Sequence, residues 1–477
     1  MTAECRTILD SIGKVVAMAE ALGLTCTVNT PALPITDARR MVYLLLEADG
    51  GMATDVLPVN LAIVVDVSES MRFHLVTNAQ FKELARTGML QEVLVDGMPA
   101  WQSADIPNEV LTRLPRKVDR VRDALQAAVE QLRPADRFAL VAFAGQAITL
   151  IPNSAGAEPV KSRLLDIVDE LDRLQLGDDT YIGRGMALGF EELRRGASSG
   201  LANRLLVLTD GFTLDEDDCR AWAVHARQVR IPISTMGLGG EFNEELMIPI
   251  ADQTGGEAYL LEDPEDITAA FAKELQRAQA VRYRNLELKL RPSQGVEVRT
   301  AHRTRPSIAP LEVVNEGGSY SFPLGDLVAG EEPALLLELI VPPRPAGIYR
   351  LAQALLACDD PAGGPAGLKT RADVVVEYTP DLAQAAHLVP QVMHVIEALS
   401  AYKLQQRARA DLEAGDVANA TRKLRAAATR LLDMGEEKLA AEMEQQAAEL
   451  ERRGQADPRR TKRLRYQTRK LTGTREV

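Results

Sequence analysis

Short apolar runs alternate with amphipathic stretches through the middle of the chain, from about residue 59 to residue 280. Four runs have the length and composition of buried strands: Asn60–Val65, Arg137–Phe143, Arg204–Leu208 and Ile231–Met236. Between them, stretches such as Val118–Leu132 and Gly183–Leu193 carry apolar residues three or four positions apart, as helices packed on one face do. This alternation predicts a doubly wound α/β domain with a mostly parallel sheet over residues 57–280.

The segments on either side of this domain predict strands without helices between them. The candidates are Leu24–Val28, Met41–Leu46, Leu286–Leu290, Val296–Thr300, Leu335–Ile340, Tyr349–Ala357 and Ala372–Glu377. Clusters of Gly and Pro separate several of them, which is typical of a β-sandwich. We therefore expect one discontinuous sandwich, built from residues 23–56 and 281–378, into which the α/β domain is inserted.

The C-terminal region is rich in Ala, Leu, Glu and Arg and shows no strand pattern. Its three helical stretches are Gln391–Ala414, Val417–Met434 and Glu436–Arg453. Each ends next to a glycine that can cap a helix, so residues 381–453 are predicted to form an α-helical domain. Residues 454–477 carry a strong excess of Lys and Arg and are predicted to be a basic tail, most simply a solvated one.

Composition and charge limit the partners and the cellular compartment that suit this protein. The net charge of −13 argues against general nucleic-acid binding and suits a cation site or basic partners. The four cysteines have no C-x-x-C spacing, which favours a reducing compartment. The N-terminal residues lack the apolar stretch of a signal peptide, and no apolar run is long enough to span a bilayer. A cytoplasmic protein is the resulting expectation.

Polar side chains gather where the predicted strands end. The first strand leads into Asp66, Ser68 and Ser70, a later loop contains Thr180, and another strand leads into Asp210. Because these loops leave the carboxyl edge of the sheet, where ligands bind in such folds, we expect them to meet. Hydroxyls with few carboxylates suit Mg²⁺, with Mn²⁺ or Ca²⁺ as alternatives. Asp66 and Asp210 could instead cap helices or turns, but that would leave the hydroxyls unexplained.

This D-x-S-x-S element, with the later Thr and Asp, resembles the metal-ion-dependent adhesion site of the von Willebrand factor A domain family. The layout of sandwich, α/β domain and helices is similar to that of cytoplasmic bacterial members. The resemblance implies that Ser68, Ser70 and Thr180 offer hydroxyl ligands and that Asp66 and Asp210 bind the ion directly or through water. It also implies an open metal position for a partner's carboxylate, and AAA+ ATPases or Ser/Thr kinase and phosphatase signalling proteins as partners.

The sequence departs from the simple family pattern after Met71. The next domain helix begins near Arg116-Lys117-Val118, which leaves an insert over residues 73–115. A helix over Asn78–Arg86 and a hairpin with Asp96-Gly97 at its turn are predicted within it.

The insert could serve recognition or merely pack on the domain. In the first case Phe81 and Trp101 are possible contact residues for a partner, or the insert acts as a lid. A third possibility is that an acidic residue of the insert fills the open metal position in cis. The candidates are Glu83, Glu92, Asp96, Asp105 and Glu109.

The favoured function is a metal-dependent protein-interaction module, acting as a scaffold or adaptor and not as an enzyme. One alternative is a self-assembling structural protein, in which one copy's carboxylate meets the next copy's metal and builds rings or filaments. Another is a metal-assisted hydrolase that uses Asp66 and Asp210, but no general base is evident for it.

Overall fold

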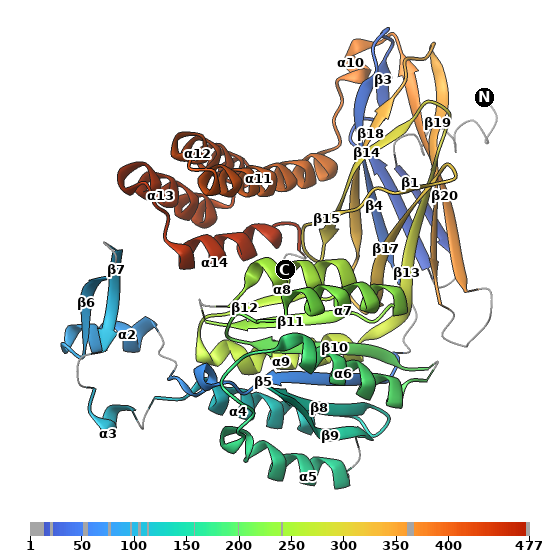
Figure 1. The fold of residues 1–477 in the computed structure, drawn as a ribbon. Coiled ribbons are helices and arrows are strands. Elements are labelled where there is room, and N and C mark those ends of the chain that lie inside the picture. The colour runs from blue at the N-terminus through green and yellow to red at the C-terminus, as the bar shows by residue number, and fades with distance from the viewer. Residues whose placement is uncertain are drawn as a thin grey trace. The chain divides into compact units, whose positions relative to one another are not determined.

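The computed structural model describes residues 14–473, apart from residues 20–21, 51–55, 75–77, 96–97, 104–105, 112–113, 157, 199, 240–241 and 360–366. The chain divides into two compact units. One is formed by residues up to 57 together with residues from 280 onward, and the other by residues 58–279. The elements of both units are labelled in Figure 1.

The unit over residues 58–279 is built on a six-stranded sheet with the order β12-β11-β10-β5-β8-β9. Its strands are β5 (Val59–Asp66), β8 (Arg137–Phe143), β9 (Ala147–Ala155), β10 (Ala202–Thr209), β11 (Ile233–Leu238) and β12 (Ala258–Leu261). Neighbouring strands run parallel except for β9, which is antiparallel to β8. The predicted mostly parallel sheet is confirmed, and β9 and β12 are strands that the sequence analysis did not predict.

Helices cover both faces of this sheet, as a doubly wound fold requires (Figure 1). One face packs against α4 (Lys117–Glu130), α5 (Glu158–Val168) and α9 (Pro264–Gln279), and the other against α6 (Ile182–Gly196), α7 (Glu216–Val229) and α8 (Glu244–Thr254). Two glycines bring α6 unusually close to the sheet. A Cβ on Gly185 would lie 2.7 Å from Val64, and one on Gly189 would lie 2.6 Å from Leu205. This close packing fixes the helix that follows Thr180.

The insert of this unit contains both of its predicted elements. The 3-10 helix η1 (Glu69–Arg72) precedes the insert, which contains α2 (Asn78–Arg86), β6 (Leu90–Val95), β7 (Met98–Ser103) and α3 (Asn108–Leu111). The strands β6 and β7 pair antiparallel, with Val95 opposite Met98. The helix and the hairpin are therefore confirmed, although the turn residues Asp96 and Gly97 lie outside the described part of the chain.

The other unit contains two six-stranded sheets. Their orders are β1-β2-β4-β18-β14-β15 and β16-β17-β13-β19-β20-β3. The bounds are β1 (Lys14–Ala19), β2 (Leu22–Val28), β3 (Ala32–Pro34), β4 (Arg40–Asp49), β13 (Val281–Pro292), β14 (Glu297–Arg305), β15 (Ala309–Leu311), β16 (Asn315–Glu316), β17 (Ser319–Val328), β18 (Ala334–Val341), β19 (Gly347–Cys358) and β20 (Leu368–Thr379). Side chains from both sheets, such as Leu44 and Leu288, share one core. Strands from before and after the inserted unit therefore form the predicted sandwich.

The C-terminal region folds into helices that pack on one another. They are α11 (Pro390–Glu413), α12 (Val417–Asp433), α13 (Glu437–Arg453) and α14 (Pro458–Arg469), whereas the short α10 (Leu382–Ala385) contacts the strands β3 and β20. Gly415, Gly435 and Gly454 follow α11, α12 and α13 with positive φ angles of 79°, 79° and 71°, the conformation that glycine caps supply. None of the helices in the described residues is both long and apolar enough to cross a membrane.

The prediction of a basic tail from residue 454 is wrong for residues 458–469, which form α14. Leu464 and Thr468 are fully buried in this helix. Its arginines reach acidic residues of α13, with Arg460 2.8 Å from Glu449. The charge run is therefore one face of a packed helix, because its basic residues alternate with residues that contact the helical core.

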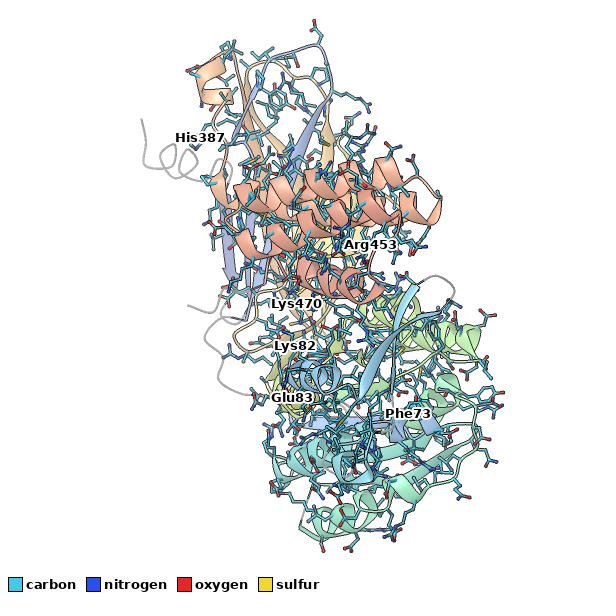
Figure 2. The ribbon with its side chains drawn as sticks, turned by 90° about the vertical axis from the view of Figure 1, so that its left-hand side faces the viewer. Phe73, Lys82, Glu83, His387, Arg453 and Lys470 are labelled. Carbon is cyan, nitrogen blue, oxygen red and sulfur yellow. The ribbon has the colours of Figure 1, made fainter. Side chains whose placement is uncertain are left out.

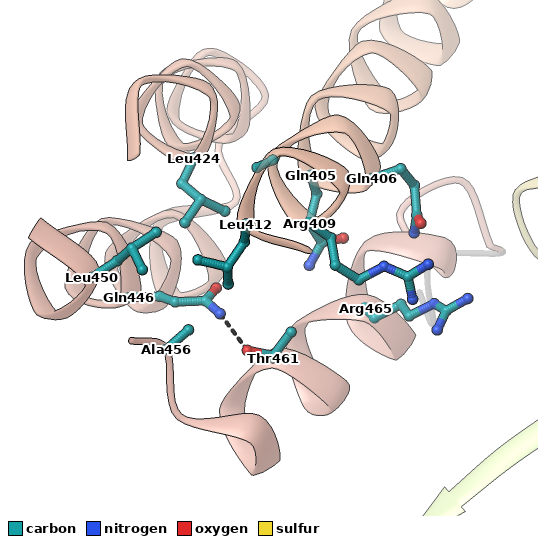
Figure 3. Close-up of a pocket in the computed structure, with 11 residues that line it drawn as sticks. Gln405, Gln406, Arg409, Leu412, Leu424, Gln446, Leu450, Ala456, Thr461 and Arg465 are labelled. Atoms are coloured by element: carbon teal, nitrogen blue, oxygen red, sulfur yellow. Dashed lines mark hydrogen bonds between the residues drawn. The ribbon is translucent and has the colours of Figure 1, made fainter. Parts of the chain in front are cut away.

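A cavity of about 30 Å³ lies among α11, α12, α13 and α14 (Figure 3). Leu412, Leu424 and Leu450 line it together with polar side chains, and Gln446 donates a hydrogen bond of 2.6 Å to Thr461 across it. A space of this size has room for only about one or two water molecules, so we assign it to the packing of the four helices.

Candidate metal centre

The strands β5 and β10 bring the two predicted aspartates together. These strands are parallel neighbours, with Val65 opposite Leu208, so both chains leave the sheet at the same edge. Asp66 is the last residue of β5, and Asp210 follows the last residue of β10. Ser70 lies in η1, which begins directly after Ser68. The sequence-predicted meeting point at the carboxyl edge of the sheet is therefore real.

Four of the five predicted ligands are linked by short hydrogen bonds. The Ser68 hydroxyl lies 3.0 Å from the Ser70 hydroxyl, and Ser70 donates to Asp210 Oδ1 at 2.7 Å. The Asp66 carboxylate accepts a bond of 2.9 Å from the Ser68 backbone N–H through Oδ1 and one of 2.7 Å from the Thr209 hydroxyl through Oδ2. The result is a cluster of carboxylate and hydroxyl oxygens drawn from two adjacent strand ends.

The cluster holds two carboxylates away from water, and this burial disfavours their charged forms. Asp66 and Asp210 are both buried. Loss of water and then the charge of Asp210 raise the pKa of Asp66 to about 6, although hydrogen bonds from Ser68 and Thr209 act in the opposite direction. Two buried carboxylates that repel each other form a place that favours a cation.

Hydrogen bonds to the backbone carbonyl of Thr180 connect its loop to the same edge of the sheet. Its carbonyl oxygen accepts hydrogen bonds from the Leu214 N–H at 3.0 Å and from the Thr213 hydroxyl at 3.1 Å. These bonds tie its loop to the segment that follows Asp210. Among the hydrogen bonds found in the described residues, none joins the Thr180 hydroxyl to the other four predicted ligands. The structure therefore brings the Thr180 loop to the site through backbone contacts.

Lys117 is a residue of this site that the sequence analysis missed. Its ammonium nitrogen lies 2.5 Å from Asp210 Oδ2, and its side chain is 12% exposed. Lys117 is the first residue of α4. A signal was available, because a lysine in the first turn of a helix opposes the helix dipole and needs a separate reason to be there.

The insert residues proposed as partner contacts lie partly beyond what the structure describes. Phe81 is in α2 and Trp101 in β7, but both side chains fall outside the described atoms. The candidate acids Glu92, Asp96 and Asp105 fall outside them as well. The carboxylate of Glu83 is paired with Arg86 in its own helix at 2.6 Å, and it is labelled in Figure 2.

Exposed apolar side chains follow the ligand loops closely in sequence. Phe212 and Leu214, just after Asp210, are 63% and 67% exposed. Phe73, three residues after Ser70, is 59% exposed and is labelled in Figure 2. Exposed apolar side chains mark a surface that contacts another protein when they form one patch, and these three are close to the cluster in sequence.

The donors in this cluster fit a hard divalent cation. No group of three or more His, Cys, Asp or Glu side chains in the described residues could hold a metal ion. The cluster offers two carboxylates and two hydroxyls instead, a set of oxygen donors that suits Mg²⁺ with part of its hydration retained. It thus lacks the ligands that Zn²⁺ prefers.

The doubly wound sheet with a cluster of oxygens at its edge defines a class of α/β domain, and the comparisons identify it. Residues 113–273 match the model of the von Willebrand factor type A domain, and residues 390–474 match the Sll0103-like C-terminal alpha-helical domain. The chain therefore contains a von Willebrand factor type A domain followed by an Sll0103-like helical domain. The first match begins near the end of the insert, so it leaves out β5 and the loop with Ser68 and Ser70.

The relatives found by sequence are themselves uncharacterised. The chain is 27% identical to the uncharacterised protein sll0103 of Synechocystis over 65% of its own length and 74% of that protein. It is 25% identical to the uncharacterised protein YfbK of Escherichia coli, and the match covers 49% of this chain and 40% of that relative.

Two solved structures share the fold along nearly the whole chain. A von Willebrand factor type A protein from Catenulispora acidiphila has a TM-score of 0.72 at 16% identity and covers 96% of this chain and 99% of its own. The ArnB paralog VWA2 from Sulfolobus acidocaldarius has a TM-score of 0.56 at 16% identity and covers 95% of this chain and 99% of its own. At this identity the likeness concerns the fold alone.

Proposed function

We propose that this protein is a metal-dependent interaction module that binds a partner protein through a divalent cation, Mg²⁺ in the first place. The observation that carries the proposal is the buried cluster in which Ser68, Ser70 and Asp210 are hydrogen-bonded in series beside Asp66. These residues would hold the cation, with the Thr180 loop next to them. A bound cation of this kind supplies positive charge that attracts a carboxylate.

The partner is expected to offer an Asp or Glu side chain. Two carboxylates balance a divalent cation only while both are charged, and hydroxyl ligands add no negative charge, so an incoming carboxylate can displace a water from the ion. The exposed side chains of Phe212 and Leu214, next to Asp210 in sequence, would add apolar contacts to the same partner. The module would act as a scaffold or adaptor, and the von Willebrand factor type A fold supports this reading.

Isothermal titration calorimetry of the full chain with Mg²⁺ and with Mn²⁺ tests the cation site. We expect one bound ion in the wild type, weaker binding in Ser70→Ala and no measurable binding in Asp210→Ala. The matched controls are Ser154→Ala and Asp217→Ala, which remove a half-buried serine and an exposed aspartate elsewhere in the same unit. Equal affinity in Asp210→Ala and in the wild type would contradict the proposed ligand set.

The same variants test the partner interaction. Proteins captured on the wild type in Mg²⁺ should be lost in EDTA and on Asp210→Ala, and should be retained on Asp217→Ala. Light scattering of the purified chain is measured in parallel. Particle growth in Mg²⁺ that EDTA reverses would mean that the carboxylate comes from a second copy, as in a self-assembling protein. Partners retained equally by all variants would show that the site plays no part in binding.

A further inference from the structure

Lys117 occupies the position in which it would compete with a cation. Of the two oxygens of the Asp210 carboxylate, Oδ1 accepts a hydrogen bond from Ser70 and Oδ2 lies 2.5 Å from the Lys117 ammonium. The Asp210 side chain is fully buried. A divalent cation that binds Asp210 must therefore approach a carboxylate that already carries a positive partner.

The charges in the cluster show why both cations do not fit together. Asp66 and Asp210 supply two negative charges, and Lys117 supplies one positive charge. The ammonium alone leaves a negative charge uncompensated, a divalent cation alone balances the two carboxylates, and the two together would give a buried excess of positive charge. A divalent cation and an ammonium that share one buried carboxylate, with little water between them, repel each other strongly.

The side chain of Lys117 can leave without moving its helix. The backbone N–H of Lys117 donates to the Phe73 carbonyl oxygen at 3.0 Å. The preceding Arg116 is held by Asp119 at 2.8 Å and by Asp172 at 3.1 Å. Rotation of the flexible four-carbon stem is therefore enough to release Asp210, and an ammonium on such a stem makes no rigid two-point contact as a guanidinium would.

We propose that Lys117 is a built-in competitor of the cation: its ammonium neutralises Asp210 while the cation is absent and is displaced when the cation binds. The inference rests on the proposed cation site and adds a residue that lowers the affinity of this site for the cation. It also explains why a lysine stands in the first turn of α4, where the helix dipole disfavours it. The consequence is that the protein fills this site only where the free cation concentration is high enough to displace Lys117.

Calorimetric titration of the full chain with MnCl₂ and with MgCl₂ tests the competition. The variant Lys117→Met removes the ammonium and keeps a stem of similar length. The matched control is Lys161→Met, which makes the same change on α5, where the ammonium donates to the backbone carbonyl oxygen of Glu130 at 3.3 Å. We expect Lys117→Met to bind Mn²⁺ at least tenfold more tightly than the wild type, about 1.4 kcal/mol, and Lys161→Met to match the wild type.

Folding of the variant is checked independently of cation binding. Urea unfolding in EDTA and in MnCl₂ should show a larger stabilisation by Mn²⁺ in Lys117→Met than in the wild type, because tighter binding stabilises the folded state more. A variant that unfolds in EDTA and refolds with Mn²⁺ also supports the proposal.

The outcomes separate this inference from the proposed function. If the wild type binds the cation and Lys117→Met binds it with equal or lower affinity, the competition is refuted and the cation site stands. Binding to Lys117→Met alone would support the competition and refute a cation in the wild type at the concentrations tested. No binding to either protein would overturn both.

Discussion

The two ends of β10 each hold a buried ion pair, but the pairs differ in how fully their charges are balanced. Arg204, near the start of the strand, lies 3.0 Å from Glu274, with both side chains almost completely buried. Ser234 and Tyr259 donate further hydrogen bonds of 2.6 and 2.7 Å to the same carboxylate. Burial alone would raise the pKa of Glu274, yet the charges of Arg204 and Arg277 and these bonds hold it below its usual value.

At the other end of β10, Lys117 neutralises Asp210 but leaves Asp66 beside it without an equal positive partner. Burial of the carboxyl group and then the charge of Asp210 raise the pKa of Asp66 to about 6. One strand thus supports a balanced charge network at its start and an unbalanced one at its end. The comparison teaches that burial of charge does not by itself point to function, whereas an uncompensated buried carboxylate in a cluster of oxygens makes a candidate site.

The balanced pair should matter most for stability. Glu274→Gln leaves Arg204 buried without its counter-charge, so the free energy of unfolding should fall by about 3–5 kcal/mol. Asp210→Asn should cost no more than about 1 kcal/mol in EDTA, because Lys117 can extend its ammonium to solvent. Urea unfolding followed by tryptophan fluorescence measures both, since Trp101 and Trp222 belong to this unit. Equal losses in the two variants would show that the two ends do not differ.

A third buried titratable group is a histidine of the sandwich, and burial disfavours its charged form. Burial and then the charge of Lys403 lower the pKa of His302 to about 4, although Glu338 acts in the opposite direction. The unfolded state protonates this histidine near pH 6.5, so stability is complete above that pH and falls as the pH drops towards 4. The loss should reach about 3 kcal/mol.

Urea unfolding of the sandwich, followed by circular dichroism between pH 7 and pH 4, measures this effect. The variant His302→Gln cannot titrate and should lack the corresponding part of the pH dependence. A wild type and a variant that lose stability in parallel would place the acid sensitivity elsewhere.

Asp66→Asn should stabilise the cation-free protein, by about 3 kcal/mol at pH 7. The folded-state pKa of about 6 lies above the ordinary value of 3.8, so the wild type loses stability as the pH rises through 6 and the amide does not. The difference between the two proteins in EDTA should therefore grow from pH 4 to pH 7. Thermal unfolding at several pH values checks this, and a variant less stable than the wild type at pH 7 would contradict it.

The sequence predicted those parts of the molecule that depend on local pattern. The strand before Asp66, the hairpin around Asp96-Gly97 and the glycines after the helices each follow from residues close together in the chain. The convergence of Ser70 and Asp210 was also predictable, because parallel strands place their carboxyl ends at one edge of the sheet.

The parts that depend on distant partners were missed. Lys117 is 93 residues from Asp210, and no local pattern connects them. The basic segment of α14 was interpreted as solvated because its partners, such as Glu449, lie on another helix. Sequence patterns show which charges are present, but only the fold shows which of them become neighbours.

The points where the chain enters and leaves the inserted unit lie next to each other: the Leu57 N–H donates to the Val281 carbonyl oxygen at 2.8 Å. The sandwich strands on either side are thus separated by roughly 220 residues of chain that must be made first. If the inserted unit folds as it is synthesised, its own compaction draws Leu57 and Val281 together and removes most of the entropy cost of closing that loop. The von Willebrand factor type A domain then helps the sandwich that carries it to fold, and its misfolding would leave the first four strands without the partners that complete their sheets.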